Sequence, residues 1–335
     1  MGLKSLGEEG IIALFADRGD RIPPGLVKGI GDDCAVIVPD PQSKVLLTTD
    51  VMIEGVHFKP ETTPPHVLGR KLLAVNVSDL AAMGARPRFA LLTLGLPPDT
   101  DPEFVSQLAL GLKEACREYD VTLVGGDTVR SPHGVVASLV MWGESTAARL
   151  PYRSAAVKGD GIFVTGTLGD SGAGCELLNS ARSQVPQQLH HKLVDAHLNI
   201  RPRLDLGQHL VQQGQINAMI DLSDGLARDL DRVARASRVG AEIWPERIPL
   251  SQELRELGRL WGRDPLDWAL YGGEDYELLF TAPCPAGMDG NHDLSAHFGV
   301  SVYWVGTITA DPGVLLVDQK GKRPLPDQGF SHFGE

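Results

Sequence analysis

Cysteine is scarce in this sequence, and its spacing excludes the residue's commonest structural roles. Four cysteines occur in 335 residues, at Cys34, Cys116, Cys175 and Cys284, and none form a Cys-x-x-Cys pair. Neither a zinc site nor a disulfide framework is therefore indicated. Long apolar runs are also missing, since no stretch reaches membrane-span length and the opening MGLKSLGEEG lacks an apolar signal core. We expect a cytoplasmic protein that does not bind membranes.

Positive charge is the second shortage. Lys and Arg together number 31 against 43 Asp and Glu, which gives a formal net charge of -12. No Lys/Arg cluster offers a footprint for a phosphate backbone, so nucleic acid is not an expected partner. An acidic chain that handles anionic substrates needs metal cations between the two sets of charges.

The familiar phosphate-binding signatures are absent as well. The Gly321-Lys322 pair is followed by Arg323, so no Walker A motif is present, and no protein-kinase signature occurs. The glycine-rich stretch 166–174, GTLGDSGAG, follows a predicted strand and opens a predicted helix, where backbone N–H groups could approach a phosphate. The pattern is weak because many strand–helix turns are rich in glycine. Within it, Ser171 does not fit a nucleophile elbow, since Ala173 occupies the final glycine position.

What the sequence does contain is an alternation of strand and helix patterns that predicts a mixed α/β fold. Hydrophobic residues make up 42% of the chain, enough for two domains, and we place the boundary near residue 148, giving domains 1–148 and 149–335. The polar stretch with His190, His191 and His197 is expected to face solvent. Strands are predicted at 34–38, 44–49, 89–96, 121–126, 135–143, 161–166, 217–222, 275–282 and 301–308, and helices at 66–85, 102–119, 167–178, 202–214 and 225–237.

Acidic residues recur where predicted strands end. KVLLTTD ends on Thr48, Thr49 and Asp50, and VTLVGGDT ends on Gly126 and Asp127. NAMIDLSDG ends on Asp221, Ser223 and Asp224, and GIGDD places Asp32 and Asp33 before another strand. Ligands bind beyond the carboxyl ends of strands in open α/β sheets, so these side chains could converge on one site.

Asp79 strengthens that interpretation. On the helix predicted over 66–85 it shares one face with Leu68, Leu72 and Val75. A carboxylate on an apolar stripe is costly unless it is paired or bound to a metal. Taken singly, the aspartates also fit turns and caps, with Asp224 a plausible N-cap. Taken together they indicate hard oxygen ligands for Mg²⁺, which usually also binds substrate phosphates.

Two other motifs allow two interpretations each. His57, in EGVHF, follows an acidic strand end and either faces the same site or lies on the surface. YGGEDYELLF places Gly272, Gly273 and Glu274 before a strand, which indicates either a tight turn or a close approach of the backbone to another group.

In chain order these segments resemble the thiamine-monophosphate kinase family. The matching stretches are GIGDDCAV, TTDVMIEGVHF, KLLAVNVSDLAAMGARP, LVGGDT, VTGTLGDSGAG, IDLSDGL, YGGEDYELLF and the terminal GFSHF, which together span nearly the whole chain. The GIGDD, GGDT and SDG pieces are shared more loosely with the wider superfamily of aminoimidazole ribonucleotide synthetase-like enzymes.

The resemblance implies a fold and a set of site residues. It implies a two-domain fold in which the N-terminal domain binds metal and ATP and pairs with a second copy into a β-barrel. The C-terminal domain then completes the ATP and thiamine-phosphate site. The implied nucleotide contacts are Gly126, Asp127, Arg153 and Ser223, and the implied thiamine-phosphate contacts are His57, Glu274 and Phe330. The implied Mg²⁺ ligands are Asp33, Thr48, Thr49, Asp50, Asp79, Asp127, Asp221 and Asp224.

The activity implied is ATP-dependent phosphorylation of thiamine monophosphate to thiamine diphosphate by a homodimer, with several Mg²⁺ ions and no protein nucleophile or base. Phe330 stands where the family pattern has Trp or Tyr, which keeps a stacking face but loses the polar handle. Two alternatives remain. One is a related ATP-dependent synthetase with a different acceptor pocket, and the other is a non-catalytic protein that binds nucleotide or thiamine phosphate.

Overall fold

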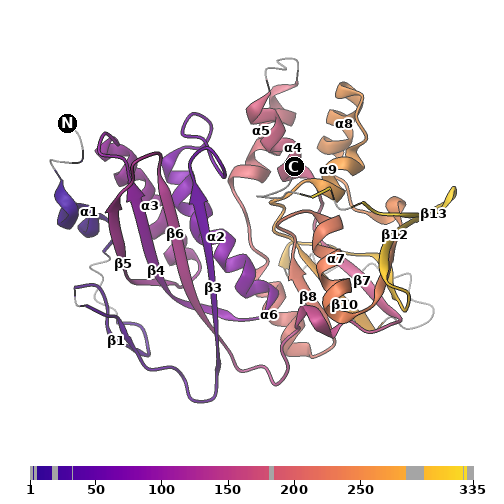
Figure 1. The fold of residues 1–335 in the computed structure, drawn as a ribbon, viewed down its shortest axis with the longest axis horizontal. Helices are drawn as coiled ribbons and strands as arrows, with labels where there is room; N and C mark the ends of the chain where they lie inside the picture. The colour runs from indigo at the N-terminus through magenta and orange to yellow at the C-terminus, as the bar shows by residue number, and fades with distance from the viewer. Residues whose placement is uncertain are drawn as a thin grey trace. The chain divides into compact units, whose positions relative to one another are not determined.

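The computed structural model describes residue 3 and residues 6–16, 22–31, 33–180, 185–283, 298–326 and 328–329. It divides into two compact units, one of Met1–Leu80 with Ala85–Ala147, the other of Ala81–Gly84 with Ala148–Glu335. Each unit is described by itself below, and Figure 1 labels their elements. None of the described helices has the combination of length and apolarity that a membrane crossing requires.

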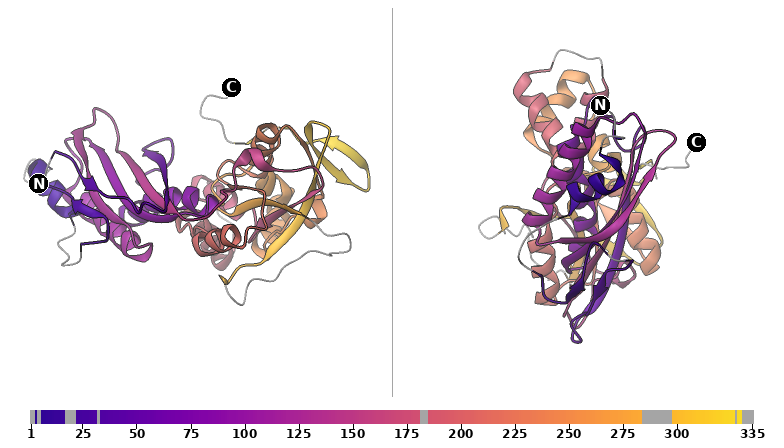
Figure 2. Two further views of the ribbon diagram at one scale, coloured as in Figure 1. Left: turned by 90° about the horizontal axis from the view of Figure 1, so that it is seen from below. Right: turned by 90° about the vertical axis from the view of Figure 1, so that its left-hand side faces the viewer.

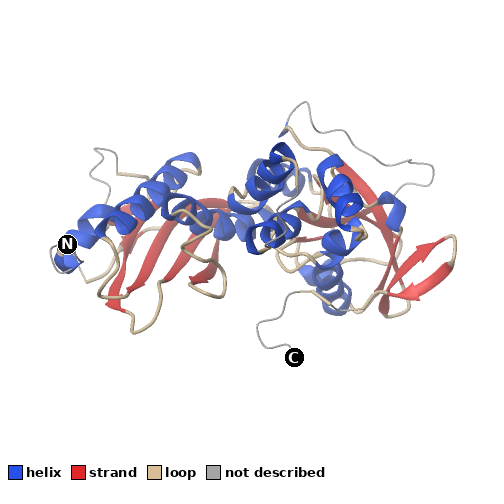
Figure 3. Cartoon of the chain, turned by 90° about the horizontal axis from the view of Figure 1, so that it is seen from above, coloured by secondary structure: helices blue, strands red, loops and turns tan. Residues whose placement is uncertain are grey.

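The first unit is built on a four-stranded sheet with the strand order β3-β6-β4-β5. β6 pairs antiparallel with both of its neighbours, and β4 pairs parallel with β5. Figure 3 shows the helices of this unit on one side of the sheet. The elements are α1 (Gly7–Phe15), β1 (Leu26–Lys28), β2 (Val36–Ile37), β3 (Lys44–Ile53), α2 (Pro65–Ala82), β4 (Arg86–Leu96), α3 (Pro102–Glu118), β5 (Thr122–Arg130) and β6 (Val136–Ser145).

The two faces of this sheet differ in burial. Side chains alternate along a strand, so Leu46, Thr48, Asp50 and Met52 face the helices, whereas the residues between them point away. The outward face exposes apolar side chains to solvent. They are Val45, Leu47 and Val51 of β3, Leu91 of β4 and Val140 of β6, with Leu47 67% exposed.

The second unit is built on a seven-stranded sheet with the order β13-β12-β9-β11-β7-β10-β8. Its β12–β13 hairpin, yellow in Figure 2, projects from one edge. The elements are η2 (Arg153–Ala155), β7 (Asp160–Thr165), α4 (Asp170–Asn179), α5 (Gln187–Leu198), α6 (Leu204–Gln213), β8 (Ala218–Asp221), α7 (Leu226–Ser237), β9 (Gly240–Ile243), η3 (Pro245–Arg247), α8 (Gln252–Trp261), α9 (Pro265–Tyr271), β10 (Leu278–Pro283), β11 (Val302–Thr309), β12 (Gly313–Asp318) and β13 (Gly321–Pro324).

The main core of this unit lies between its sheet and α7. Leu226, Leu230 and Val233 of α7 are fully buried against strand residues such as Ile162 and Ile220. A smaller apolar cluster joins α4, α5, α8 and α9 around the buried Trp268. The loops between β8 and α7, and between α9 and β10, are held by this packing.

Three expectations from the sequence need correction. Asp50 and Asp127 do not end their strands, because β3 continues to Ile53 and β5 continues to Arg130. The strand expected over 34–38 is reduced to Val36–Ile37. His197 does not face solvent, because it lies on α5 with 6% of its surface exposed. The sequence around His197 is polar, but it forms an amphipathic helix that buries Leu189, Leu193 and His197 on one side.

Candidate active site

Three of the predicted metal ligands, Thr48, Asp50 and Asp79, meet on the helix-facing side of β3. The Thr48 Oγ1 donates a hydrogen bond to Asp79 Oδ2. Asp50 is two residues along on the same face of β3, and its carboxyl group is hydrogen-bonded to that of Asp79. Burial, followed by the negative charge of Asp79 and this hydrogen bond, raises the pKa of Asp50 to about 7. Two carboxyl groups therefore share a site in which they resist being ionised together.

The packing of α2 explains how Asp79 reaches this position. Leu68, Leu72 and Val75 are buried with at most 2% exposure, and Asp79 is half-buried on the same helical face. The structure buries the three apolar positions that the sequence singled out, but it also buries all the other residues of the helix from 71 to 78. A carboxylate on an apolar stripe is held beside a second carboxylate, which is the arrangement that a bound cation stabilises.

The donor set at this position suits a hard divalent cation. It consists of two carboxyl groups and a hydroxyl group, all of them oxygen donors of the kind that Mg²⁺ prefers. Within the part of the chain that the structure describes, no three His, Cys, Asp or Glu side chains lie close enough together to hold a metal ion. The remaining positions around a cation at Asp50 and Asp79 would then belong to substrate phosphates and water.

Thr49 and Asp127 lie on the other face of the same sheet. Asp50 pairs with Leu139, Leu139 with Leu92, and Leu92 with Gly126, so these four share a face. Asp127, next to Gly126, pairs with Thr93 on the opposite face and is exposed. β3 and β5 are also the two edges of the sheet, about 14 Å apart at the usual strand spacing. One chain's first unit therefore does not bring Asp50 and Asp127 together.

Three other predicted residues of this unit have identifiable local roles. Gly126 has a φ of 156°, and a Cβ there would lie 1.9 Å from the Leu92 carbonyl oxygen. The close pairing of β5 with β4 therefore requires glycine at this position. His57 accepts a hydrogen bond from the Ile53 N–H at its Nδ1, at 3.1 Å, which fixes its ring after β3. Asp33 is exposed in the turn between β1 and β2. Asp32 lies outside the described residues, as does Phe330.

In the second unit, the sequence correctly placed an acidic strand end before a helix. Asp221 is the last residue of β8 and is buried, with 3% exposure. Ser223 and Asp224 follow in the loop that leads into α7. Asp224 is not the N-cap of α7, because Gly225 occupies that position. Its carboxylate instead accepts a hydrogen bond from Arg232, in the second turn of the helix.

Asp229 instead fixes the loop that precedes the helix. Its Oδ2 accepts hydrogen bonds from the N–H groups of Ser223 and Asp224, at 3.1 and 2.9 Å. Burial raises the pKa of Asp229 to about 6, although those backbone hydrogen bonds and the charge of Arg232 oppose the rise. At neutral pH the carboxylate is thus mostly ionised. Asp229 shares the buried face of α7 with Leu226, Leu230 and Val233, so the apolar-stripe argument that singled out Asp79 would have found it too.

Arg153 lies at the other end of α7 from Ser223. Its carbonyl oxygen accepts a hydrogen bond from the Ser237 hydroxyl at 2.8 Å, and Ser237 is the last residue of the helix. A 12-residue helix is about 18 Å long, so the structure does not place these two predicted nucleotide contacts side by side. The Arg153 side chain is exposed.

Glu274 is held against the loop that carries Ser223. It adopts a φ of +65°, and its N–H donates to the Ser223 carbonyl oxygen at 2.8 Å. Its carboxylate lies 3.2 Å from Nδ1 of His197, which is also 3.2 Å from the Ser171 hydroxyl. The YGGEDYELLF segment is therefore both of the things considered from its sequence, a constrained turn and a close backbone approach.

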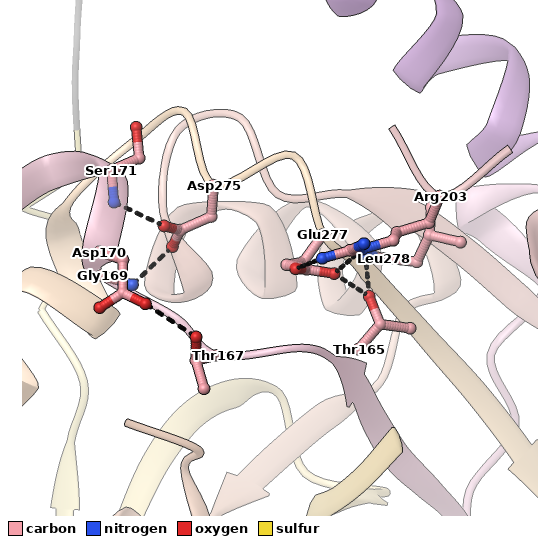
Figure 4. A network of polar contacts seen from close by, with 9 residues as sticks. All are labelled: Thr165, Thr167, Gly169, Asp170, Ser171, Arg203, Asp275, Glu277 and Leu278. Carbon is pink, nitrogen blue, oxygen red and sulfur yellow. Dashed lines mark hydrogen bonds and ion pairs between the residues drawn. The ribbon is translucent and has the colours of Figure 1, made fainter. Parts of the chain in front are cut away.

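The other two acids of that segment are structural (Figure 4). Asp275 is half-buried and accepts hydrogen bonds from the N–H groups of Gly169 and Ser171, at 2.8 and 3.4 Å. The start of α4 thus already holds an internal carboxylate where a phosphate was considered. Burial raises the pKa of Asp275 well above its usual range. Glu277 accepts hydrogen bonds from Arg203 Nε at 2.6 Å and the Thr165 hydroxyl at 2.5 Å.

Comparison with known proteins first defines the class. Two family models match, "AIR synthase related protein, N-terminal domain" over residues 31–145 and "AIR synthase related protein, C-terminal domain" over residues 157–318. The chain is therefore an AIR synthase-related protein with both domains of that class.

The relatives within this class are more specific. The thiamine-monophosphate kinase of Escherichia coli K12 is 38% identical over 98% of each chain. That of Aquifex aeolicus is 41% identical over 84% of this chain and 88% of its own. The solved structure of AaThiL complexed with AMPPCP and TMP matches 99% of both chains, with a TM-score of 0.77 and 35% identity. This chain belongs to the thiamine-monophosphate kinase family.

Proposed function

We propose that this protein transfers the γ-phosphoryl group of ATP to the phosphate of thiamine monophosphate. The bond between the γ-phosphorus and the ADP oxygen breaks, and a bond to a phosphate oxygen of thiamine monophosphate forms, which releases ADP and thiamine diphosphate. The observation that carries the proposal is the 38% identity to a thiamine-monophosphate kinase over 98% of both chains. The related AaThiL structure, which holds AMPPCP and TMP, supports both substrate classes.

The chemistry needs no protein base. A phosphomonoester has its second pKa near about 6, so the accepting phosphate is already mostly a dianion at neutral pH. Mg²⁺, when bound, supplies the positive charge that offsets repulsion between two polyanions and aligns them. The chain's own part would be to supply oxygen ligands, and the contacts among Thr48, Asp50 and Asp79 in the first unit support that role.

We assign the remaining roles as part of the same proposal. Asp33, Thr49, Asp127, Asp221 and Asp224 would complete the metal ligands when both substrates are present. Gly126, Asp127, Arg153 and Ser223 would contact the nucleotide, and His57, Glu274 and Phe330 the thiamine phosphate. Domain 1–148 would thus carry most of the metal ligands, ATP contacts and the dimer contacts, and domain 149–335 would complete the ATP and thiamine-phosphate site. The cytoplasmic location remains a prediction.

An ADP-release assay tests the function directly. With Mg²⁺ and ATP, ADP release should depend on thiamine monophosphate, be absent with thiamine alone, and yield thiamine diphosphate on chromatography. Removing Mg²⁺ with a chelator should abolish it. Release that depends instead on an aminoimidazole-type precursor would identify a related synthetase, and no release at all with bound nucleotide would identify a binding protein.

We further propose that the protein is a homodimer joined through the outward face of the four-stranded sheet. Val45, Leu47, Val51, Leu91 and Val140 form a contiguous exposed apolar surface there, because their strands are neighbours and their registers align. Covering that surface with the same surface of a second copy removes it from water. Thr49 and Asp127 lie on this face, so dimerisation would also change their surroundings.

A charge on this face should break the dimer. Leu47→Glu places a carboxylate in the proposed interface and should raise the dimer dissociation constant more than about a hundredfold, because an unpaired buried charge costs several kcal/mol. Analytical ultracentrifugation measures the change. The control is Leu110→Glu, which alters an exposed leucine on α3, on the helical side of the unit. A wild-type protein that sediments as a monomer at micromolar concentration would overturn the proposal.

A further inference from the structure

The loop between β8 and α7 is fixed by a carboxylate that the function proposed above does not use. The Asp229 side chain has no exposed surface. Its Oδ2 accepts two backbone hydrogen bonds from the loop, from Ser223 at 3.1 Å and Asp224 at 2.9 Å. Its Oδ1 accepts a hydrogen bond from Nη1 of Arg232 at 2.6 Å. One buried carboxylate thus binds both the loop and a guanidinium group.

Arg232 closes the arrangement into a ring. Its Nη2 donates to Oδ2 of Asp224 while its Nη1 donates to Asp229. Arg232 is 41% exposed and Asp224 is 23% exposed at the side chain, whereas Asp229 is enclosed. Two carboxylates and one guanidinium give the ring a net charge of -1. The guanidinium therefore faces two anions, one buried and one open to solvent and to ligands.

The backbone that carries Asp224 is fixed from the other side as well. The Leu222 and Ser223 carbonyl oxygens accept hydrogen bonds from the N–H groups of Tyr276 and Glu274, each at 2.8 Å. Gly225 has a φ of +101°, and a Cβ there would lie 2.9 Å from the Gly272 carbonyl oxygen. Since the main chain has little freedom, the availability of the Asp224 carboxylate depends on how strongly Arg232 holds it.

We propose that Asp229 is a positioning residue that neutralises Arg232 and thereby leaves the Asp224 carboxylate available to a divalent cation. The inference rests on the proposed function, in which Asp224 is a metal ligand. A guanidinium and a cation compete for the same carboxylate oxygens, and a second carboxylate on the guanidinium weakens that competition. A purely structural role would need only the hydrogen bonds from Ser223 and Asp224.

Charge counting separates the two roles. Asp229→Asn leaves Arg232 with Asp224 as its one anionic partner in the ring, and the ring becomes neutral. Arg232→Gln removes the competitor and makes the ring -2. The double variant restores the ring to -1. Each single variant changes the charge of the ring by one unit, which should alter the dissociation constant for a divalent cation about tenfold. Binding should be weaker for Asp229→Asn and tighter for Arg232→Gln. The double variant should return to within about threefold of wild type.

The readout is binding of Mn²⁺ to the full chain in the presence of AMPPCP, measured by electron paramagnetic resonance without turnover. Arg232→Lys is the matched control, because it keeps the charge and should bind Mn²⁺ about as wild type does. Equal binding by all variants would overturn the inference, and so would a double variant weaker than both single variants. If Asp229→Asn does not fold, Arg232→Gln alone decides, since weaker binding there contradicts the proposal. The wild-type ADP-release assay tests the function separately, so the two failures are distinguishable.

Discussion

Asp50→Asn should abolish turnover and, in the absence of divalent cations, raise the melting temperature at pH 8. The loss of activity should exceed about a thousandfold, because the variant removes one of the charges proposed to hold the cation between the two substrates. The gain in stability has a separate cause. In the metal-free protein the carboxyl groups of Asp50 and Asp79 lie together in a partly buried site, and asparagine removes their repulsion.

The pH dependence of this gain follows from the direction of the pKa shift. The pKa of Asp50 rises from 3.8 to about 7, so between these values the folded protein binds more protons than the unfolded chain. The free energy of unfolding of the wild type should therefore fall as pH rises from about 4 to about 7, by at most about 4 kcal/mol. The amide in the Asp50→Asn variant does not titrate, so the stabilisation should be full at pH 8 and vanish near pH 4.

Calorimetry of metal-free protein at pH 4, 6 and 8 measures the effect, which should be on the order of 5 °C at pH 8. Asp99→Asn, in the exposed loop after β4, is the control and should leave the melting temperature unchanged at each pH. Mg²⁺ with nucleotide should stabilise the wild type more than the variant. Full kinase activity in Asp50→Asn would contradict the role assigned to this carboxylate.

Glu277→Ala should be among the most destabilising single changes in the second unit. Glu277 is buried, with both carboxylate oxygens on Arg203 and one of them also on the Thr165 hydroxyl. The Thr165 hydroxyl oxygen in turn accepts the Leu278 N–H at 2.8 Å, next to the pairing of β10 with β7. Removing the carboxylate breaks the salt bridge with a guanidinium whose side chain is 26% exposed, which costs about 3–5 kcal/mol.

Urea unfolding followed by circular dichroism measures this loss. Lys322→Ala removes one partner of the exposed pair with Glu242, and should cost less than about 1 kcal/mol. Glu277→Gln keeps the shape of the side chain without its charge and should lie between the two. A Glu277→Ala variant as stable as the Lys322→Ala control would show that Arg203 finds another partner when Glu277 is removed.

The sequence predicted elements better than their ends. The long helices α2, α3 and α7 appear where expected. The apolar stripes of α3 and α7 leave little choice of buried face, whereas α2 is buried on all sides over residues 71–78. The strand ends predicted at Asp50 and Asp127 were wrong. In the local sequence an aspartate is typical of a strand end, but pairing of β3 with β6 and of β5 with β4 extends both strands beyond it. Propensity is local, and these pairings join residues far apart in the chain.

The candidate site was predictable in part for the same reason. Asp79 could be found because a single carboxylate interrupts an apolar stripe. His197 could not, since its burial depends on α4 and Glu274, neither of which is near it in sequence. The separate roles of Glu274, Asp275 and Glu277 were also hidden, because three acids within four residues look alike until the backbone turns each to a different partner.

The two main-chain hydrogen bonds that join 222–223 to 274–276 have a pharmacological consequence. Because both hydrogen bonds join main-chain groups directly, the two segments should move together. With the roles proposed for Glu274 and Ser223, a compound that displaces Glu274 should also displace the loop that carries Ser223, so an inhibitor directed at the thiamine-phosphate contacts should also weaken nucleotide affinity.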